Sequence, residues 1–135
     1  MTVKQIQIPL RTGQRSEWID ITEEIRRVVS SSGISNGICT VNSLHTTAAV
    51  TINENADPDV GIDFFSKLSQ LIPRDSGFRH SEGNSDSHIK AALVGFSVQV
   101  AIKGNDLLLG TWQSIYFCEF DGPRSRSVWI TLMGE

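Results

Sequence analysis

The chain has 135 residues and a formal net charge of −3, with 12 lysines and arginines against 15 aspartates and glutamates. Hydrophobic residues at 39% and charged residues at 20% are ordinary globular values, so a disordered chain is excluded, and the length fits a single domain spanning 1–135. An acidic pI near 5.6 argues against nucleic acid as the partner, because neutralising phosphates requires clustered basic residues.

The chain also lacks the usual signals for a membrane or a disulfide framework. No apolar stretch approaches the roughly 18 to 20 residues that cross a bilayer, and the first residues lack the apolar core of a signal peptide. We therefore expect a cytoplasmic protein with no membrane partner. Cys39 and Cys118 lie far apart in apolar runs and match no zinc-ligand spacing, so we expect two reduced, buried thiols.

Two strands and a helix are predicted at the start of the chain. Apolar residues alternate with polar ones over Lys4 to Leu10 and again over Glu17 to Ile21, a pattern that predicts a hairpin. Apolar residues then recur at helical spacing from Ile21 to Val29 until Gly33 supplies a stop. We expect a short amphipathic helix directly after the hairpin.

The middle of the chain predicts two more strands, a second helix and a long loop. Gly37 to Ser43 and Ala48 to Asn53 are rich in β-branched residues, and the junction between them is polar. Asp57 followed by proline is typical of a helix start, and the apolar face that follows ends at Pro73. Arg74 to Ser87 has no apolar period, so we expect a loop, followed by a brief helix through Ala92.

The last third predicts three main strands and one short hairpin arm. Phe96 to Ile102 alternates strictly, and the following Lys-Gly-Asn-Asp turn leads back into Leu107 to Leu109, which indicates a hairpin. Trp112 to Phe120 and Ser127 to Met133 also read as strands. The Trp112 to Phe120 strand is apolar on both faces, so it needs a cover on both, and we expect the second cover to be another sheet or another subunit.

These elements occur in the order ββαββαβββ. Hairpin-length connections dominate, so the strands are expected to pair mostly antiparallel. The predicted fold class is α+β, a small β-sandwich with two to three helices.

Three histidines lie in polar junctions or loops: His45 between two predicted strands, His80 within the long loop, and His88 at the far end of that loop. Imidazole is a common transition-metal ligand, and three protein ligands with one open position form the usual catalytic zinc site. The three residues are therefore candidate ligands of a divalent metal, zinc or magnesium. Independent hydrogen-bonding roles are the alternative.

Carboxylates accompany the histidines. Glu54 and Asp57 follow the segment of His45, and Glu82 and Asp86 lie between the other two histidines. Asp86 and Glu54 are the candidate general acid or base, with His45 as a third catalytic candidate. Capping of a helix is the alternative role for Asp57 and Asp86.

Candidate substrate-binding residues are polar or aromatic side chains near these groups. Arg124 and Arg126 lie two apart after a turn, which on one strand directs both to the same face, where they can grip a phosphate. In the alternative reading Arg124 forms a surface ion pair with Asp121 or Glu119. An aromatic ring can stack on a heterocycle, and hydroxyls and amides can supply neutral hydrogen bonds. The remaining candidates are Thr46, Thr47, Asn84, Trp112 and Gln113.

Several runs of the sequence resemble the YjbQ family, many of whose members carry only the label of uncharacterised protein. The runs are LHTTAAVTINENADPDV, His80 with EGNSDSH ending at His88, ALVGFSVQVAI and GNDLLLGTWQSIYFCEFDGPRSR. The resemblance extends from about Gln5 to Leu132, and the GTWQ block is its most specific part.

The resemblance implies an α+β domain with a β-sandwich that assembles as a homotrimer. The family's characteristic histidines match His45, His80 and His88, and its acidic and amide positions match Glu54, Asp57, Asn84 and Asp86. Members are described as having a secondary thiamine-phosphate synthase activity. In that reaction a thiazole nitrogen displaces diphosphate from a methylene carbon, which makes it an alkyl transfer.

The sequence and the resemblance together predict a metal-dependent enzyme acting on a small phosphorylated or heterocyclic metabolite, without an organic cofactor. Two alternatives stay open at this point. One is a metal- or small-ligand-binding module without turnover. The other is a phosphoester hydrolase, which would use nearly the same groups.

Overall fold

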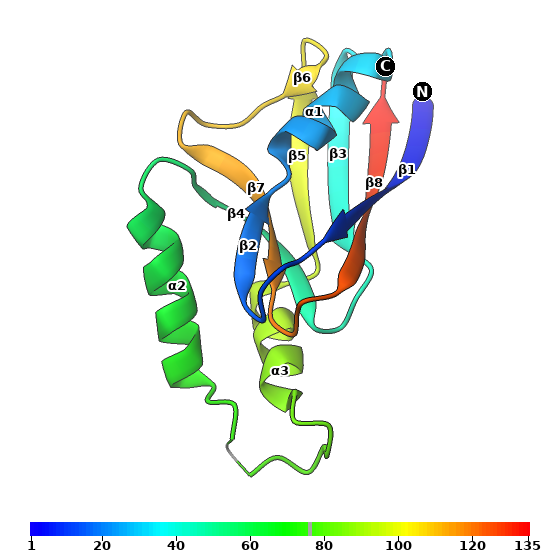
Figure 1. The fold of residues 1–135 in the computed structure, drawn as a ribbon. Helices are drawn as coiled ribbons and strands as arrows, with labels where there is room; N and C mark the ends of the chain where they lie inside the picture. The colour runs from blue at the N-terminus through cyan, green and yellow to red at the C-terminus, as the bar shows by residue number, and fades with distance from the viewer. Residues whose placement is uncertain (76) are drawn as a thin grey trace.

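A computed structural model describes residues 1–75 and 77–135 as two β-sheets packed together, with three helices around them (Figure 1). The described strand pairings are all antiparallel, which confirms the predicted α+β class and the mostly antiparallel sandwich. The elements in chain order are β1 (Thr2–Arg11), β2 (Glu17–Asp20), α1 (Thr22–Ser31), β3 (Asn36–Ser43), β4 (Ala48–Glu54), α2 (Pro58–Leu71), α3 (Ser85–Val94), β5 (Ser97–Lys103), β6 (Asp106–Leu107), β7 (Gln113–Glu119) and β8 (Ser125–Gly134).

The main hydrophobic core lies between the two sheets. The larger sheet has the strand order β1-β8-β3-β5-β6, and the smaller has β2-β7-β4. Successive side chains of a strand point to opposite faces, so alternate residues of β3 and β8 enter the core while their neighbours face outward. Val41 and Ile130 from the large sheet meet Val50 and Phe117 from the small one, and all four are at most 1% exposed.

Strand β7 is buried on both faces, as its composition predicts, and another sheet, the first of the two covers expected, packs on one of them. One face joins the core between the sheets, and Tyr116, Cys118 and the adjoining Phe120 pack against residues of α2 and α3, among them Phe65 and Ala91. This strand therefore gives no argument for an oligomer.

The predicted hairpin of the first two strands does not form. Strand β1 pairs with β8 in the large sheet, whereas β2 pairs with β7 in the small one. The connection between them crosses from one sheet to the other, where the Thr12 N–H donates to the carbonyl of Arg124 at 3.0 Å. Apolar alternation fixes which side chains face the core, but it does not identify the neighbouring strand.

The observed order is ββαββααββββ, which differs from ββαββαβββ by the brief helix through Ala92 and the short arm at Leu107; both were expected and both form. The brief helix anticipated near Asp86 is the ten-residue α3, so the loop before it is shorter than expected. The β5–β6 hairpin is confirmed, although β6 has only two residues. Its turn places Gly104 and Asn105 at φ 60° and 61°, the left-handed conformation that glycine and asparagine tolerate in a two-residue hairpin turn.

The outward face of the large sheet carries no charged side chain over three successive rows that cross β1, β8, β3 and β5. Register places residues of the four strands side by side in each row. The first row is apolar, with Val3, Ile38 and Met133 each more than two-fifths exposed. The rows are Val3, Met133, Ile38 and Ala101; Gln5, Thr131, Thr40 and Gln99; and Gln7, Trp129, Asn42 and Ser97.

The expectations about cysteines and membrane spans can be compared directly with the structure. Cys39 and Cys118 are free and fully buried, as predicted, and burial raises the pKa of each thiol to about 12. Such thiols are chemically inert. Within residues 1–75 and 77–135, no helix is long and apolar enough to cross a membrane.

Candidate functional site

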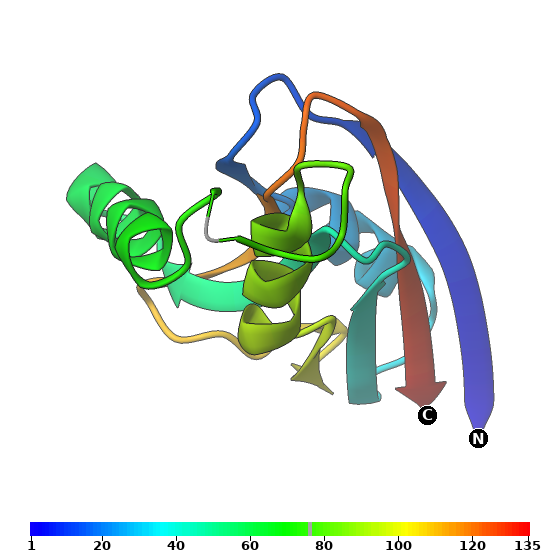
Figure 2. The same ribbon diagram turned by 90° about the horizontal axis from the view of Figure 1, so that it is seen from below.

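Polar segments that are far apart in the sequence meet where the sandwich ends beside the first turn of α3. Hydrogen bonds join them, because Ser87 Oγ donates to the carbonyl of Phe120 at 2.6 Å and the Phe120 N–H donates to the carbonyl of Thr47 at 3.2 Å. Figure 2 looks onto this end of the molecule from below. We call it the α3 end, and it comprises residues 12–15, 44–47, 77–88 and 119–127.

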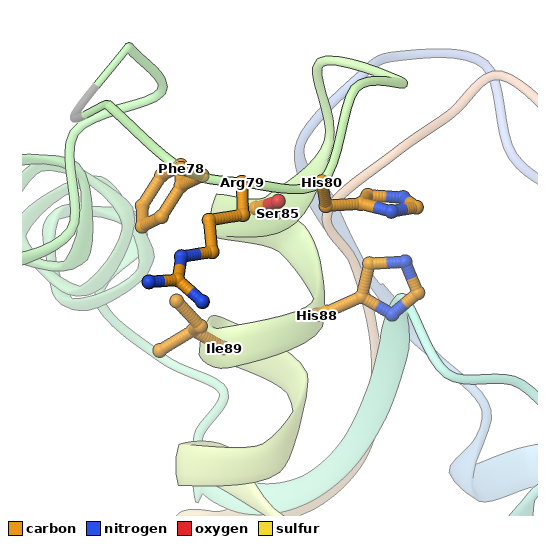
Figure 3. A pocket seen from close by; sticks show the side chains of 6 residues that line it. All are labelled: Phe78, Arg79, His80, Ser85, His88 and Ile89. Carbon is orange, nitrogen blue, oxygen red and sulfur yellow. The ribbon is translucent and has the colours of Figure 1, made fainter.

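His80 and His88 form a pair at the α3 end. The centres of their rings are 5.5 Å apart, the rings are perpendicular, and both project to the same side of α3 (Figure 3). His80 comes from the loop before the helix and His88 from the helix itself. A shallow hollow of about 390 Å³ lies beside them; its lining residues are Phe78, Arg79, His80, Ser85, His88 and Ile89.

Two buried polar atoms beside this hollow lack a hydrogen-bond partner among the described residues. They are Oδ1 of Asn84 and Oγ of Ser85, on residues that are each 9% exposed. Asn84 precedes α3, but its side chain does not cap the helix; its Nδ2 instead donates to Asp121 Oδ2 at 2.8 Å. Buried polar atoms are nearly always paired in native proteins, so two orphans side by side indicate a ligand or ordered water.

His45 occupies the junction between β3 and β4, as predicted, and is half-buried there. Its Nε2 accepts the N–H of Ser127 at 2.9 Å, and its ring meets the edge of Phe117. Burial lowers the pKa of His45, the Arg126 guanidinium lowers it further, and the Glu119 carboxylate opposes the shift. The hydrogen bond to Nε2 needs a lone pair, so the structure holds this imidazole neutral.

The lowered pKa of His45 predicts a pH-dependent stability. Because the unfolded chain binds the proton at the ordinary value near 6.5 and the folded chain only at a lower pH, stability is complete above about pH 6.5 and is lost as the pH falls. We expect His45→Gln to reduce the loss of unfolding free energy between about pH 7.5 and pH 5.5. Urea unfolding of both proteins across this range measures the two slopes, and equal slopes would contradict the prediction.

A buried ion pair between Glu119 and Arg126 lies at the α3 end. Glu119 is fully buried and accepts two hydrogen bonds from Arg126, through Nε at 2.7 Å and through Nη2, and one from Thr12 Oγ1 at 2.8 Å. Arg126 Nη2 also donates to Thr47 Oγ1 at 2.8 Å. Burial alone would raise the pKa of Glu119, but these hydrogen bonds outweigh it, so the pKa is lowered and the carboxylate is ionised.

A second buried carboxylate lies within α3. Asp86 is fully buried and is held by Lys90 Nζ at 2.9 Å and by Arg15 Nη2 at 3.2 Å. Burial raises the pKa of Asp86, but the hydrogen bonds from Arg15 and Lys90 outweigh it and lower the pKa overall. A carboxylate enclosed by two cations is poorly suited to accept a proton from a substrate.

The two arginines predicted to grip one phosphate are not brought together as a pair. Arg126 is 7% exposed and its donors are engaged by Glu119 and Thr47, whereas Arg124 lies before β8 begins. Arg124 Nη2 donates to Asp121 Oδ2 at 3.0 Å and its Nε to the carbonyl of the same residue. This is the surface ion pair that was the alternative to phosphate binding in the sequence analysis.

Three predicted site residues lie far from the α3 end. Glu54 pairs with Gln113 at one end of the β4–β7 ladder, whereas Ala48 pairs with Glu119 at the other. Six strand residues at about 3.3 Å each separate these ends by roughly 20 Å. Trp112, next to Gln113, is 61% exposed at this remote end. Within one chain, neither the carboxylate of Glu54 nor the indole of Trp112 reaches a ligand beside the histidine pair.

The geometry suits a metal ligated by His80 and His88 better than one ligated by all three histidines. Zinc–nitrogen distances of about 2.0–2.1 Å and tetrahedral angles put the centres of two ligating imidazoles roughly 5 Å apart, close to the 5.5 Å between His80 and His88. Among the residues described, however, no three His, Cys, Asp or Glu side chains are grouped closely enough to hold an ion. His45 has only Nδ1 left for coordination, because Nε2 is hydrogen-bonded.

Sequence reasoning placed the histidines, Asn84 and Asp86 at one site, but it missed several residues that shape that site. Glu119 lies within the apolar run IYFCEF, and a carboxylate buried in such a run needs a cationic partner. The sequence could therefore have predicted a buried ion pair at this residue. Lys90 lies four residues after Asp86, the spacing of a helical ion pair. No sequence pattern identifies Arg15, because its contact with Asp86 spans 71 residues.

Comparison with known proteins gives a consistent result. The family model described as UPF0047 protein YjbQ-like matches residues 6–135. A UPF0047 protein of Methanocaldococcus jannaschii is 49% identical over 93% of this chain and 91% of its own, and UPF0047 protein YugU of Bacillus subtilis is 46% identical over 94% and 97%.

Solved structures show the same fold. An uncharacterised conserved protein of the YjbQ/UPF0047 family from Clostridium acetobutylicum superposes with a TM-score of 0.93 at 48% identity, covering 95% of this chain and 99% of its own. A YbjQ-like protein of unknown function from Sulfolobus solfataricus gives a TM-score of 0.95 at 31% identity, covering 99% of both chains.

Proposed function

The chain belongs to the UPF0047 protein YjbQ-like family, and we propose that it is a metal-dependent enzyme that joins two small heterocyclic metabolites by alkyl transfer with loss of diphosphate. This is a thiamine-phosphate synthase activity, which can be secondary to another reaction. The observation that carries the proposal is the pair of His80 and His88 beside a hollow at the start of α3. It combines metal-binding side chains with a helix N-terminus, which favours anions.

The reaction does not require the protein to transfer a proton. The thiazole nitrogen attacks the methylene carbon with its own lone pair, a nitrogen–carbon bond forms, and the carbon–oxygen bond to diphosphate breaks. The nitrogen becomes cationic and diphosphate leaves as an anion, so no general base is required. A site of this kind needs to position two rings and to neutralise the leaving group.

His80 and His88 would hold the divalent ion, with His45 contributing through Nδ1 if it joins them. Imidazole ligands favour zinc over magnesium. A bound ion would neutralise negative charge on the departing diphosphate. Glu82, whose carboxylate is 3.7 Å from His80 Nε2, would orient the His80 ring. Phe78 and Ile89, on the apolar side of the hollow, would contact the ring of a bound heterocycle.

A phosphoester hydrolase fits the site less well. Hydrolysis needs an activated water, and the two predicted carboxylates are poorly placed to act as its base: Asp86 is enclosed by Arg15 and Lys90, and Glu54 lies at the far end of β4. The same observation favours the second candidate function, a metal- or small-ligand-binding module without turnover. The two readings differ in whether a joined product forms.

The test is a coupling assay with the purified protein. Hydroxymethylpyrimidine diphosphate and thiazole phosphate are incubated with the protein and either zinc or magnesium, and the joined product is measured. We expect product that disappears when a chelator is added or when His88 is replaced by Ala, and that persists in Ser69→Ala, a change on the exposed face of α2. Metal binding with no product under either metal would overturn the synthase in favour of the binding module.

We also propose that the chain assembles as a homotrimer through the outward face of the large sheet. The three uncharged rows on that face support this, because an exposed apolar row beside uncharged polar ones is typical of a subunit contact. Light scattering is expected to give about three times the chain mass of 14.9 kDa. Met133→Lys, placed in the apolar row between Val3 and Ile38, is expected to shift the mass toward the monomer, and a monomeric wild type would contradict the proposal.

A further inference from the structure

We propose that the first turn of α3 is the subsite for a terminal phosphate group, which it holds through the N–H groups of Ser85 and Asp86, the Ser85 hydroxyl and the Arg79 guanidinium. The inference rests on the proposed function for the class of ligand, a phosphate ester or diphosphate. It replaces the pair of Arg124 and Arg126 that the sequence favoured, since both are engaged elsewhere.

The helix supplies two unpaired backbone donors at this point. An α-helix leaves its first four N–H groups without a partner inside the helix. In α3 one of them, the N–H of Ser87, turns back to the carbonyl of Asn84 at 3.0 Å, and the N–H of His88 begins the regular helical bonds by donating to the same carbonyl at 3.3 Å. Those of Ser85 and Asp86 have no partner among the described residues, and the Asn84 side chain does not cap the helix. Two adjacent N–H groups at a helix start are a favourable environment for phosphate oxygens.

The Ser85 hydroxyl is an independent sign of a ligand. Ser85 lines the hollow beside the histidine pair and is 9% exposed, and its Oγ is buried without a partner in the described part of the chain. A hydroxyl donor next to two unpaired N–H groups matches the several acceptor lone pairs of one phosphate group. Filling this position would satisfy an atom that otherwise carries an unfavourable burial cost.

The charges around the turn also favour an anion. The carboxylate of Asp86 would repel one, but Arg15 and Lys90 both bind it, so this buried cluster carries excess positive charge. Arg79 extends over the hollow between Phe78 and Ile89 (Figure 3), with no described ion pair. Two carboxylates oppose an anion: Glu82, whose side chain is 72% exposed and therefore well screened by water, and Asp121, whose charge is paired with Arg124 at 3.0 Å.

The test measures binding of inorganic phosphate and of diphosphate, titrated separately by calorimetry in the presence of a chelator. We expect Ser85→Ala to weaken binding about tenfold, the effect of losing one charge-assisted hydrogen bond, and Arg79→Gln to weaken it by a similar factor at low salt. The matched controls Ser69→Ala and Arg27→Gln, on exposed helix surfaces, are expected to bind as the wild type does. Tighter binding of diphosphate assigns the subsite to the leaving group, and tighter binding of phosphate assigns it to the ester.

Backbone amide spectra supply the second readout, because the N–H groups themselves cannot be removed by a side-chain change. Phosphate is expected to shift the ¹⁵N–¹H signals of Ser85 and Asp86 more than those of α1. Unchanged amide signals at these two residues, or equal affinity in folded Ser85→Ala and wild type, would overturn the subsite. Because no metal and no second substrate are present, this result is independent of turnover: a protein that fails the coupling assay can still bind phosphate here.

Discussion

Replacing Arg126 by Met is expected to destabilise the fold by about 3–5 kcal/mol, the largest effect on stability that we predict for a single substitution. Glu119 is fully buried, and Arg126 supplies two of the hydrogen bonds that keep it ionised. Removing the cation leaves an uncompensated charge in the interior. Urea or guanidinium unfolding at neutral pH measures the difference in unfolding free energy.

A matched control and a double variant separate the buried charge from mere loss of packing. Arg124→Met removes the exposed ion pair with Asp121 and is expected to change stability by no more than about 1 kcal/mol. Adding Glu119→Leu to Arg126→Met removes the orphaned carboxylate, so the double variant should recover part of the lost stability. A double variant less stable than Arg126→Met alone would show that the charge is not the cause.

Replacing His80 or His88 by Ala is expected to reduce metal affinity by at least about tenfold, the largest functional effect that we predict. Both rings project to one side of α3 at a separation that suits two ligands of one ion. The measurement is calorimetric titration of zinc into each folded variant. Metal analysis of the purified proteins gives a second reading, and unchanged affinity in either variant would remove that residue from the site.

The same titration decides the place of His45. If its ring joins the ion through Nδ1, His45→Ala lowers the affinity as much as the other two changes do. If the hydrogen bond from Ser127 to Nε2 is its whole role, His45→Ala leaves metal affinity unchanged while stability still changes. The pH dependence predicted for His45→Gln provides an independent reading of the second role.

The sequence allowed two different predictions for the role of Asp86. Its place near the start of a predicted helix allowed either capping or acid–base chemistry. In the structure no cap from Asp86 forms, because its carboxylate turns inward to Arg15 and Lys90, which leaves an excess of positive charge beneath the first turn of α3. The helix could be predicted, but the direction of its side chain depended on partners that lie outside the helix.

Local patterns by themselves determined much of this protein. The elements α2, β3, β4, β5 and β8 lie close to their predicted positions, and the Asp57–Pro58 helix start is formed as expected, with Asp57 Oδ1 accepting the N–H of Asp59 at 2.9 Å. The polar junction and loop that carry the histidines were also evident, since such segments interrupt the apolar period. Periodicity, capping and turn chemistry depend on residues close in the chain, so one sequence is enough to read them.

Only the tertiary structure decided which of those segments meet. It separated β1 from β2 into different sheets, covered one face of β7 with helices and placed Glu54, Trp112 and Gln113 roughly 20 Å from the α3 end. It also paired Glu119 with Arg126 and left Ser85 without a partner. These outcomes follow from strand register and from contacts between distant segments. Such contacts are determined by the packing of the whole core, and they produce no periodic pattern in the sequence.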